Sequence, residues 1–200
     1  MDFLNWKNLL SILFGGILAG LLLGGYKAYE QHRKEEIAKK LYLAEELLYK
    51  NQTAEAEKLA SEIPPPAVGY LYLRLGDYYA SHRKLDEAFA EFKNAAEVFN
   101  STDKPLHYFS LERAAYILYR KGDYEKSLQL LDSLPDDIPN FCEVQLLKAE
   151  NYAALGDYTR LTEIANRIVQ SCPDKTIRMT VDYLVYKYRG KGEIKPVRSE

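Results

Sequence analysis

Few residues of the kinds that do catalytic chemistry occur in this sequence, and they form no catalytic pattern. The chain of 200 residues has three histidines, and none stands at metal-ligand spacing from another histidine or a cysteine: His32, His82 and His107. It contains no glycine-rich phosphate loop, no H-E-x-x-H and no G-x-S-x-G. Asp136 and Asp137 are an acidic pair, but their proline-flanked position is typical of a solvated loop. We therefore expect no enzyme activity, no metal site and no cofactor.

The two cysteines are the remaining reactive pair. Cys142 falls at the start of one predicted helix, and Cys172 falls just past the end of the next. Antiparallel helices would place these ends side by side, and a disulfide needs Cα atoms within about 7 Å. Our hypothesis is a disulfide, which would favour an extracytoplasmic domain. The alternative is two unrelated small residues at helix ends.

Composition and charge indicate an ordinary folded protein over most of the chain. Hydrophobic residues make up 47% and charged residues 28%, which argues against a disordered chain. The formal net charge is -2, so no strong basic field is present to hold nucleic acid phosphates. We expect no nucleic-acid partner.

An uncharged apolar segment, Asn8 to Tyr26, lies near the N-terminus between Lys7 and Lys27. As a helix, its 19 residues would span about 28 Å, close to the hydrocarbon core of a membrane. The competing interpretation is a cleaved signal peptide, but no A-x-A site follows. We predict an uncleaved single-pass anchor.

Three glycines recur every four residues within this segment and would form a smooth helix face: Gly16, Gly20 and Gly24. Such a face lets another transmembrane helix approach closely, a neighbour's or a second copy's, although glycine is also common in membrane helices generally.

Charge around the segment bears on its orientation. Most of the basic residues follow it: Lys27, Arg33, Lys34, Lys39 and Lys40. The positive-inside rule alone would place the larger domain in the cytoplasm, against the inference from the cysteines.

The rest of the chain has the period of a helical repeat array. Tyr72, Leu75, Gly76 and Tyr79 match the W-x2-L-G-x2-Y signature of tetratricopeptide repeats with tyrosine for tryptophan. Ala88 and Phe92 then match the A-x3-F of the second helix of the same repeat. The predicted inter-helix turns stand 32, 39 and 34 residues apart: Asn51, Arg83, Gly122 and Gly156.

The predicted fold is therefore all-α: an N-terminal transmembrane helix, then a right-handed α-solenoid of about four tetratricopeptide-like repeats, then a C-terminal capping helix over 174–189. The domains would be a tail and anchor over 1–26, the repeats over 27–189 and a disordered tail over 190–200.

The concave groove of such an array is lined by the first helix of each repeat. Counting from the turns, the lining residues are Tyr70, Leu73, Asp77, Phe109, Glu112, Tyr116, Tyr119, Leu146 and Glu150. Leucine, tyrosine and acidic residues stand where other arrays hold the lysine and asparagine that clamp a C-terminal carboxylate. The acids would repel such a carboxylate, which argues against that binding mode. An aromatic and acidic groove suits an apolar or mildly basic segment of another protein. Other tyrosines of the array are expected to pack between repeats: Tyr72, Tyr79 and Tyr152.

The layout of anchor and repeats resembles the YfgM-like family, ancillary subunits of the bacterial SecYEG translocon. The resemblance rests also on the A-E-x-L-A helix at Ala56 to Ala60 and on the segment from Leu118 to Asp132. It implies an inner-membrane protein with periplasmic repeats and no catalytic residues. Its partners would be the translocon, a membrane-anchored periplasmic chaperone or exported clients. The tail from Met1 to Lys7 is shorter and less basic than is usual in that family. The alternative is a cytoplasm-facing membrane scaffold that docks a soluble complex.

Overall fold

A computed structural model describes residues 6–188, with side chains from residue 13, and its described residues are helical without any strand. The chain forms two compact units, Met1–Leu59 and Ala60–Glu200. The predicted disordered tail and the first residues of the chain lie outside the described part.

The first unit contains two helices, α1 (Trp6–Tyr49) and α2 (Thr53–Ala60). Asn51 joins them in the left-handed region, at φ 61°, as its predicted role as a helix cap requires. Helix α2 ends at Ala60. Pro64 stands four residues later, and it has no N–H to donate to the Ala60 carbonyl in a continued helix.

The apolar stretch of α1 exposes its large side chains, including Phe14, which is 72% exposed, and Leu21, which is 69% exposed. Within the part of the chain whose side chains are described, no helix has a stretch both long enough and apolar enough to cross a membrane. The predicted anchor begins at Asn8, and the side chains of its first residues, up to residue 12, lie outside that part.

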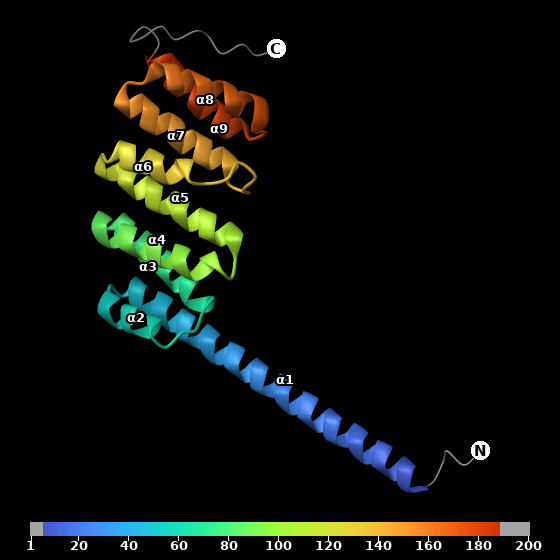
Figure 1. The fold of residues 1–200 in the computed structure, drawn as a ribbon. Coiled ribbons are helices and arrows are strands. Elements are labelled where there is room, and N and C mark those ends of the chain that lie inside the picture. Colours follow the sequence, from blue (N-terminus) through green and yellow to red (C-terminus); the bar gives the residue numbers. More distant parts are fainter. Residues whose placement is uncertain (1–5, 189–200) are drawn as a thin grey trace, which may run out of the picture. The chain divides into compact units, whose positions relative to one another are not determined.

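The second unit is a stack of helices in sequence order (Figure 1). They are α3 (Ala67–Ser81), α4 (Leu85–Asn100), α5 (Lys104–Lys121), α6 (Tyr124–Asp132), α7 (Phe141–Leu155), α8 (Tyr158–Ser171) and α9 (Lys175–Tyr188). Each helix packs on the next along the chain, and α7 also packs on α9. The paired helices α3–α4, α5–α6 and α7–α8 confirm the predicted tetratricopeptide-like solenoid, and α9 lies where the capping helix was expected.

The inter-helix turns share one geometry at the positions predicted from their spacing. Asn51, Arg83, Gly122 and Gly156 have φ values of 61°, 60°, 85° and 75°. At each turn the following residue donates its backbone N–H to the carbonyl five residues back, as in Asp123 to Leu118 and Asp157 to Tyr152, both 2.9 Å. This 6→1 bond is the mark of a Schellman cap. The repeats therefore begin from equivalent turns.

Close helix packing inside each pair follows from small residues at the crossing. A Cβ on Gly76 would lie 2.7 Å from Phe92 Cε1, so only glycine fits against that ring. Gly69 stands in the same relation to Phe99. Ala88 is fully buried, as the motif predicts. The core thus sits between successive helices.

Candidate functional site

The structure places every predicted groove residue on a first helix of a repeat: three on α3, four on α5 and two on α7. The aromatic side chains most open to solvent are Tyr70, Phe109 and Tyr116, which are 46%, 37% and 38% exposed. The remaining groove residues are partly buried. Tyr79 and Tyr152 are only 5% and 8% exposed, so these two pack in the core, and Tyr72 is partly buried.

On the α3 side of the groove, the predicted acid Asp77 is neutralised. Arg113 on α5 forms an ion pair and a hydrogen bond with the Asp77 carboxylate. The same guanidinium lies 5.5 Å from the ring centroid of Phe92 and 5.7 Å from that of Phe109. Sequence reasoning missed Arg113, because it stands 36 residues from Asp77 and only the stacking of successive repeats brings the two together. This side of the groove is aromatic and nearly neutral.

On the α7 side, neither Glu112 nor Glu150 forms an ion pair with any side chain in the described part of the chain. Burial raises the pKa of Glu112 to about 7, with the nearby Glu143 adding to the effect and Arg113 opposing it. Burial also raises the pKa of Glu150. The groove therefore becomes more negative as the pH rises through neutrality.

A cluster of tyrosines adjoins these acids. Tyr116 and Tyr119 stack with ring centroids 6.3 Å apart, and Tyr124 lies 5.6 Å from Tyr119. Burial, and then the carboxylate of Glu150, raise the pKa of Tyr119. Arg120 lies 5.9 Å from the Tyr116 ring. Aromatic surface beside carboxylates can take an apolar segment that carries a positive charge.

Cys142 and Cys172 are joined by a disulfide in the structure, with Cα atoms 5.7 Å apart. The bond links the start of α7 to the residue after α8. The Cys172 carbonyl also accepts a hydrogen bond of 2.5 Å from Arg178 Nε on α9. The disulfide therefore holds two helix ends of the last repeat together, as predicted, and the hydrogen bond from Arg178 attaches the capping helix α9 at the same point.

Gly16, Gly20 and Gly24 lie on α1 as predicted, and apart from the adjoining backbone of α1 and their chain neighbours no described atom would come within 4 Å of a Cβ added to any of them. Their packing against another helix stays a prediction. No group of three or more potential metal-binding side chains occurs within residues 13–188.

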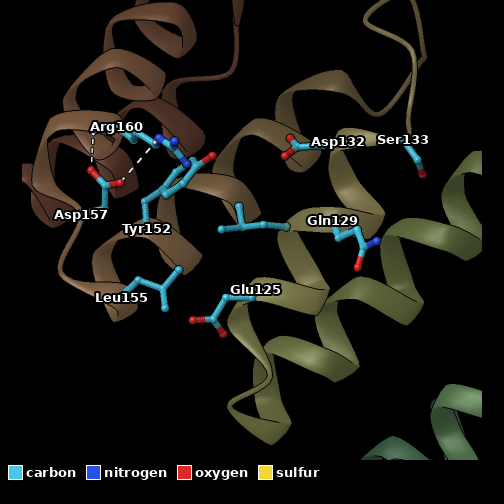
Figure 2. A pocket seen from close by; sticks show the side chains of 9 residues that line it. Glu125, Gln129, Asp132, Ser133, Tyr152, Leu155, Asp157 and Arg160 are labelled. Carbon is cyan, nitrogen blue, oxygen red and sulfur yellow. Dashed lines mark hydrogen bonds and ion pairs between the residues drawn. The ribbon is translucent and has the colours of Figure 1, made fainter.

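The outer side of the array contains hollows that sequence reasoning missed. One, of about 790 Å³, lies between α6 and α8 and is lined partly by Glu125, Gln129 and Tyr152 (Figure 2). Another, of about 530 Å³, lies between α4 and α6. Both hollows run along α6, which contributes lining residues to each.

Comparison with known proteins bears on the fold and the family. Two crystal structures of nearly identical TPR-like repeats from Podosopora anserina, ascribed to a kinesin light chain, resemble the chain. The first has a TM-score of 0.55 at 16% identity and covers 79% of this chain and 88% of its own. The second, a point variant of the same repeats, has a TM-score of 0.57 at 16% identity and covers 79% and 87%. At this identity the likeness shows the fold alone.

No curated protein sequence matches the chain. The model of one protein family does match, over residues 21–154, which include α2 to α6 and nearly all of α7. It describes the ARM repeat of tetratricopeptide repeat protein 21. Because the match spans more than half of a sequence whose helices stack as paired repeats, the chain belongs to this tetratricopeptide repeat family.

Proposed function

We propose that the chain is a non-catalytic protein-interaction module whose groove binds an apolar or mildly basic segment of another protein. The observation that carries the proposal is the line of solvent-exposed aromatic side chains on α3 and α5, beside the carboxylates of Glu112 and Glu150. Exposed aromatic rings bury much apolar area at little entropic cost, and the acids select a positive charge.

The test of the groove is crosslinking followed by a matched substitution. A photo-crosslinking amino acid at Tyr116 should capture a partner protein in native membranes. The same substitution at Tyr183, a tyrosine on α9 that is 61% exposed, should not. Tyr116→Ala should then weaken binding of the captured partner by about tenfold, while the melting temperature stays nearly unchanged. Equal capture from both positions would contradict a specific groove.

We further propose that α1 anchors the module in the bacterial inner membrane beside the Sec translocon, with the repeats in the periplasm among exported clients and chaperones. The exposed apolar side chains of α1 and the Cys142–Cys172 disulfide support this placement. Gly20→Leu or Gly24→Leu should then reduce co-purification with the translocon from mild detergent.

The second candidate is a cytoplasm-facing scaffold, which the basic residues after the apolar stretch favour. A cysteine introduced after Gly190 separates the two. In intact spheroplasts, a membrane-impermeant thiol reagent should label it if the repeats are periplasmic. Protection until the membrane is opened would favour the scaffold instead.

A further inference from the structure

The two hollows on the outer side of the array lie on either side of α6 and share two lining residues, Gln129 and Ser133. Helix α6 is therefore a ridge with a depression along each flank. Ridges of one helix pack into the depressions between others when two helical surfaces meet. This outer face is separate from the groove proposed to bind a partner segment.

The hollow between α4 and α6 has an apolar floor and a basic rim. Phe89, Leu118 and Leu130 form the apolar part. Lys93, Lys121 and Lys126 supply the positive charge. Lys121 and Lys126 have acidic partners in Asp86 and Asp123. For Lys93 no ion pair is found among the described side chains.

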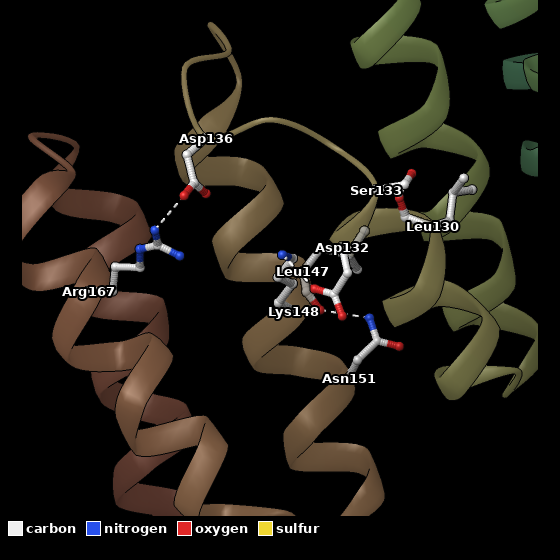
Figure 3. Close-up of polar contacts among 8 residues, drawn as sticks. All are labelled: Leu130, Asp132, Ser133, Asp136, Leu147, Lys148, Asn151 and Arg167. Atoms are coloured by element: carbon white, nitrogen blue, oxygen red, sulfur yellow. Dashed lines mark hydrogen bonds and ion pairs between the residues drawn. The ribbon is translucent and has the colours of Figure 1, made fainter.

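The hollow between α6 and α8 has the opposite character. Its charged lining residues are the acids Glu125, Asp132 and Asp157 and one cation, Arg160 (Figure 2). Its apolar and aromatic lining residues are Leu128, Tyr152 and Leu155. The Asp132 carboxylate lies 2.7 Å from Lys148 Nζ (Figure 3), and that of Asp157 lies 3.5 Å from Arg160 Nε. Glu125 forms no ion pair with any side chain in the described part of the chain. Each hollow thus offers one uncompensated charge, of opposite sign.

These two charges are of opposite sign, so a twofold axis placed midway between them would set each against its counterpart in a second copy. Lys93 stands ten residues after the turn at Arg83, and Glu125 stands three residues after the equivalent turn at Gly122. Gln129 stands seven residues after Gly122, between these two levels. An antiparallel second copy, rotated about an axis near Gln129, therefore brings its Lys93 to the level of Glu125. The same operation brings its Glu125 to the level of Lys93.

We propose that a second copy of this chain docks on the outer face. The α6 ridge of each copy enters the basic hollow of the other, and α4 of each copy covers the acidic hollow of the other. Lys93 of one copy pairs with Glu125 of the other, twice about the axis. A twofold interface needs this kind of self-complementary surface, because the same patch must serve both copies. The apolar floors of both hollows are covered in the same step.

The test uses the full chain in mild detergent, with a photo-crosslinking amino acid at Gln129. A product of twice the chain mass is expected, joined near Gln129 on both chains. Lys93→Glu alone and Glu125→Lys alone should each reduce this product by about tenfold, because like charges then face each other. The two changes together should restore it. Glu163→Lys, an exposed reversal on α8 outside both hollows, is the matched control and should change nothing.

Site-specific crosslinking separates this contact from any association through α1, which the charge reversals do not touch. Circular dichroism melting shows whether each variant folds, and Lys93→Gln and Glu125→Gln serve if a reversal does not. Capture of a different protein, or of no protein, at Gln129 would overturn the proposal. Single variants that fold but crosslink as strongly as the parent would also overturn it. A double variant whose crosslinking is not restored would do the same.

Discussion

The repeat of α3 and α4 and the repeat of α7 and α8 begin from the same turn geometry but close their helix pairs differently. Seven residues before each turn stand Gly76 and Ala149, and nine residues after it stand Phe92 and Ala165. In the first repeat a large ring fills the crossing and needs a glycine opposite it. In the last repeat both residues are small and fully buried. There the disulfide and α9 add to the packing.

The middle repeat, α5 with α6, closes its helix pair with a third combination of residues. Its equivalent residues are Ala115 and Leu131, both fully buried in one cluster. In the first and middle repeats a larger residue on one helix thus faces a smaller one on the other, as packing at nearly constant density requires. The last repeat has alanine on both helices, and there the disulfide and α9 add to the packing. In the first two repeats the motif therefore specifies a combined volume rather than one residue at one position.

The largest expected effect comes from emptying the crossing of the first of these repeats. Phe92→Ala should lower the free energy of unfolding by about 3–5 kcal/mol, because it leaves a cavity beside Gly76. Urea unfolding of the full chain in mild detergent, followed by circular dichroism, measures it. A loss below about 1 kcal/mol would mean that the ring does not carry this crossing.

Removing the disulfide should cost the last repeat less. Cys142→Ala with Cys172→Ala is expected to lower the free energy of unfolding by about 2–4 kcal/mol, because the unfolded chain regains the freedom of a long loop. The same urea unfolding, with the parent chain under non-reducing conditions as reference, measures the loss. Alkylation and intact mass without reductant show whether the parent chain has free thiols. If it does, the last repeat has no disulfide and does not differ from the first repeat in this respect.

Volume exchange within one crossing tests the comparison more finely. Gly76→Ala should destabilise by about 1–2 kcal/mol, since its new Cβ meets the Phe92 ring. Gly76→Ala combined with Phe92→Leu reproduces the Ala115–Leu131 pair and should cost less than the sum of the two single changes. A double-mutant cycle measures that coupling. Strict additivity would show that the two positions do not share one volume.

The smallest effect separates the two sides of the groove by their pH dependence. The pKa of Glu112 lies near 7 in the fold, above its usual 4.5, so the folded chain binds more protons than the unfolded chain between these values. The free energy of unfolding therefore falls, because of Glu112, as the pH rises from 4.5 through about 7. Glu112→Gln should therefore raise the free energy of unfolding by about 1 kcal/mol at pH 8 and leave it unchanged near pH 4.

Glu163→Gln, an exposed carboxyl on α8, is the control for that measurement and should show no such dependence. The paired acid Asp77 on the other side of the groove offers a contrast, because Arg113 compensates its charge. If Glu112→Gln raised the free energy of unfolding equally at every pH, the burial of the Glu112 charge would not be the cause of the gain.

Much of the fold followed from local chemistry that the sequence displays directly. Each of the four predicted turn residues adopts a left-handed φ, since asparagine, glycine and a helix-ending context at Arg83 permit it. Tyr79 and Tyr152 are buried as their motif positions predict. Helix α2 ends at Ala60, where a continued helix would need the backbone N–H that Pro64 lacks.

The site was less predictable, and for a definite reason. Sequence period identifies which residues face the groove, because side-chain direction repeats with the helix. It does not say which charge meets which, since Arg113 reaches Asp77 across 36 residues of chain. The hollows beside α6, the compensation of Asp77 and the raised pKa of Glu112 all depend on neighbours from other helices. Periodicity along the chain therefore determined the repeats and their turns, whereas packing between repeats decided the electrostatics and shape of the surfaces they present.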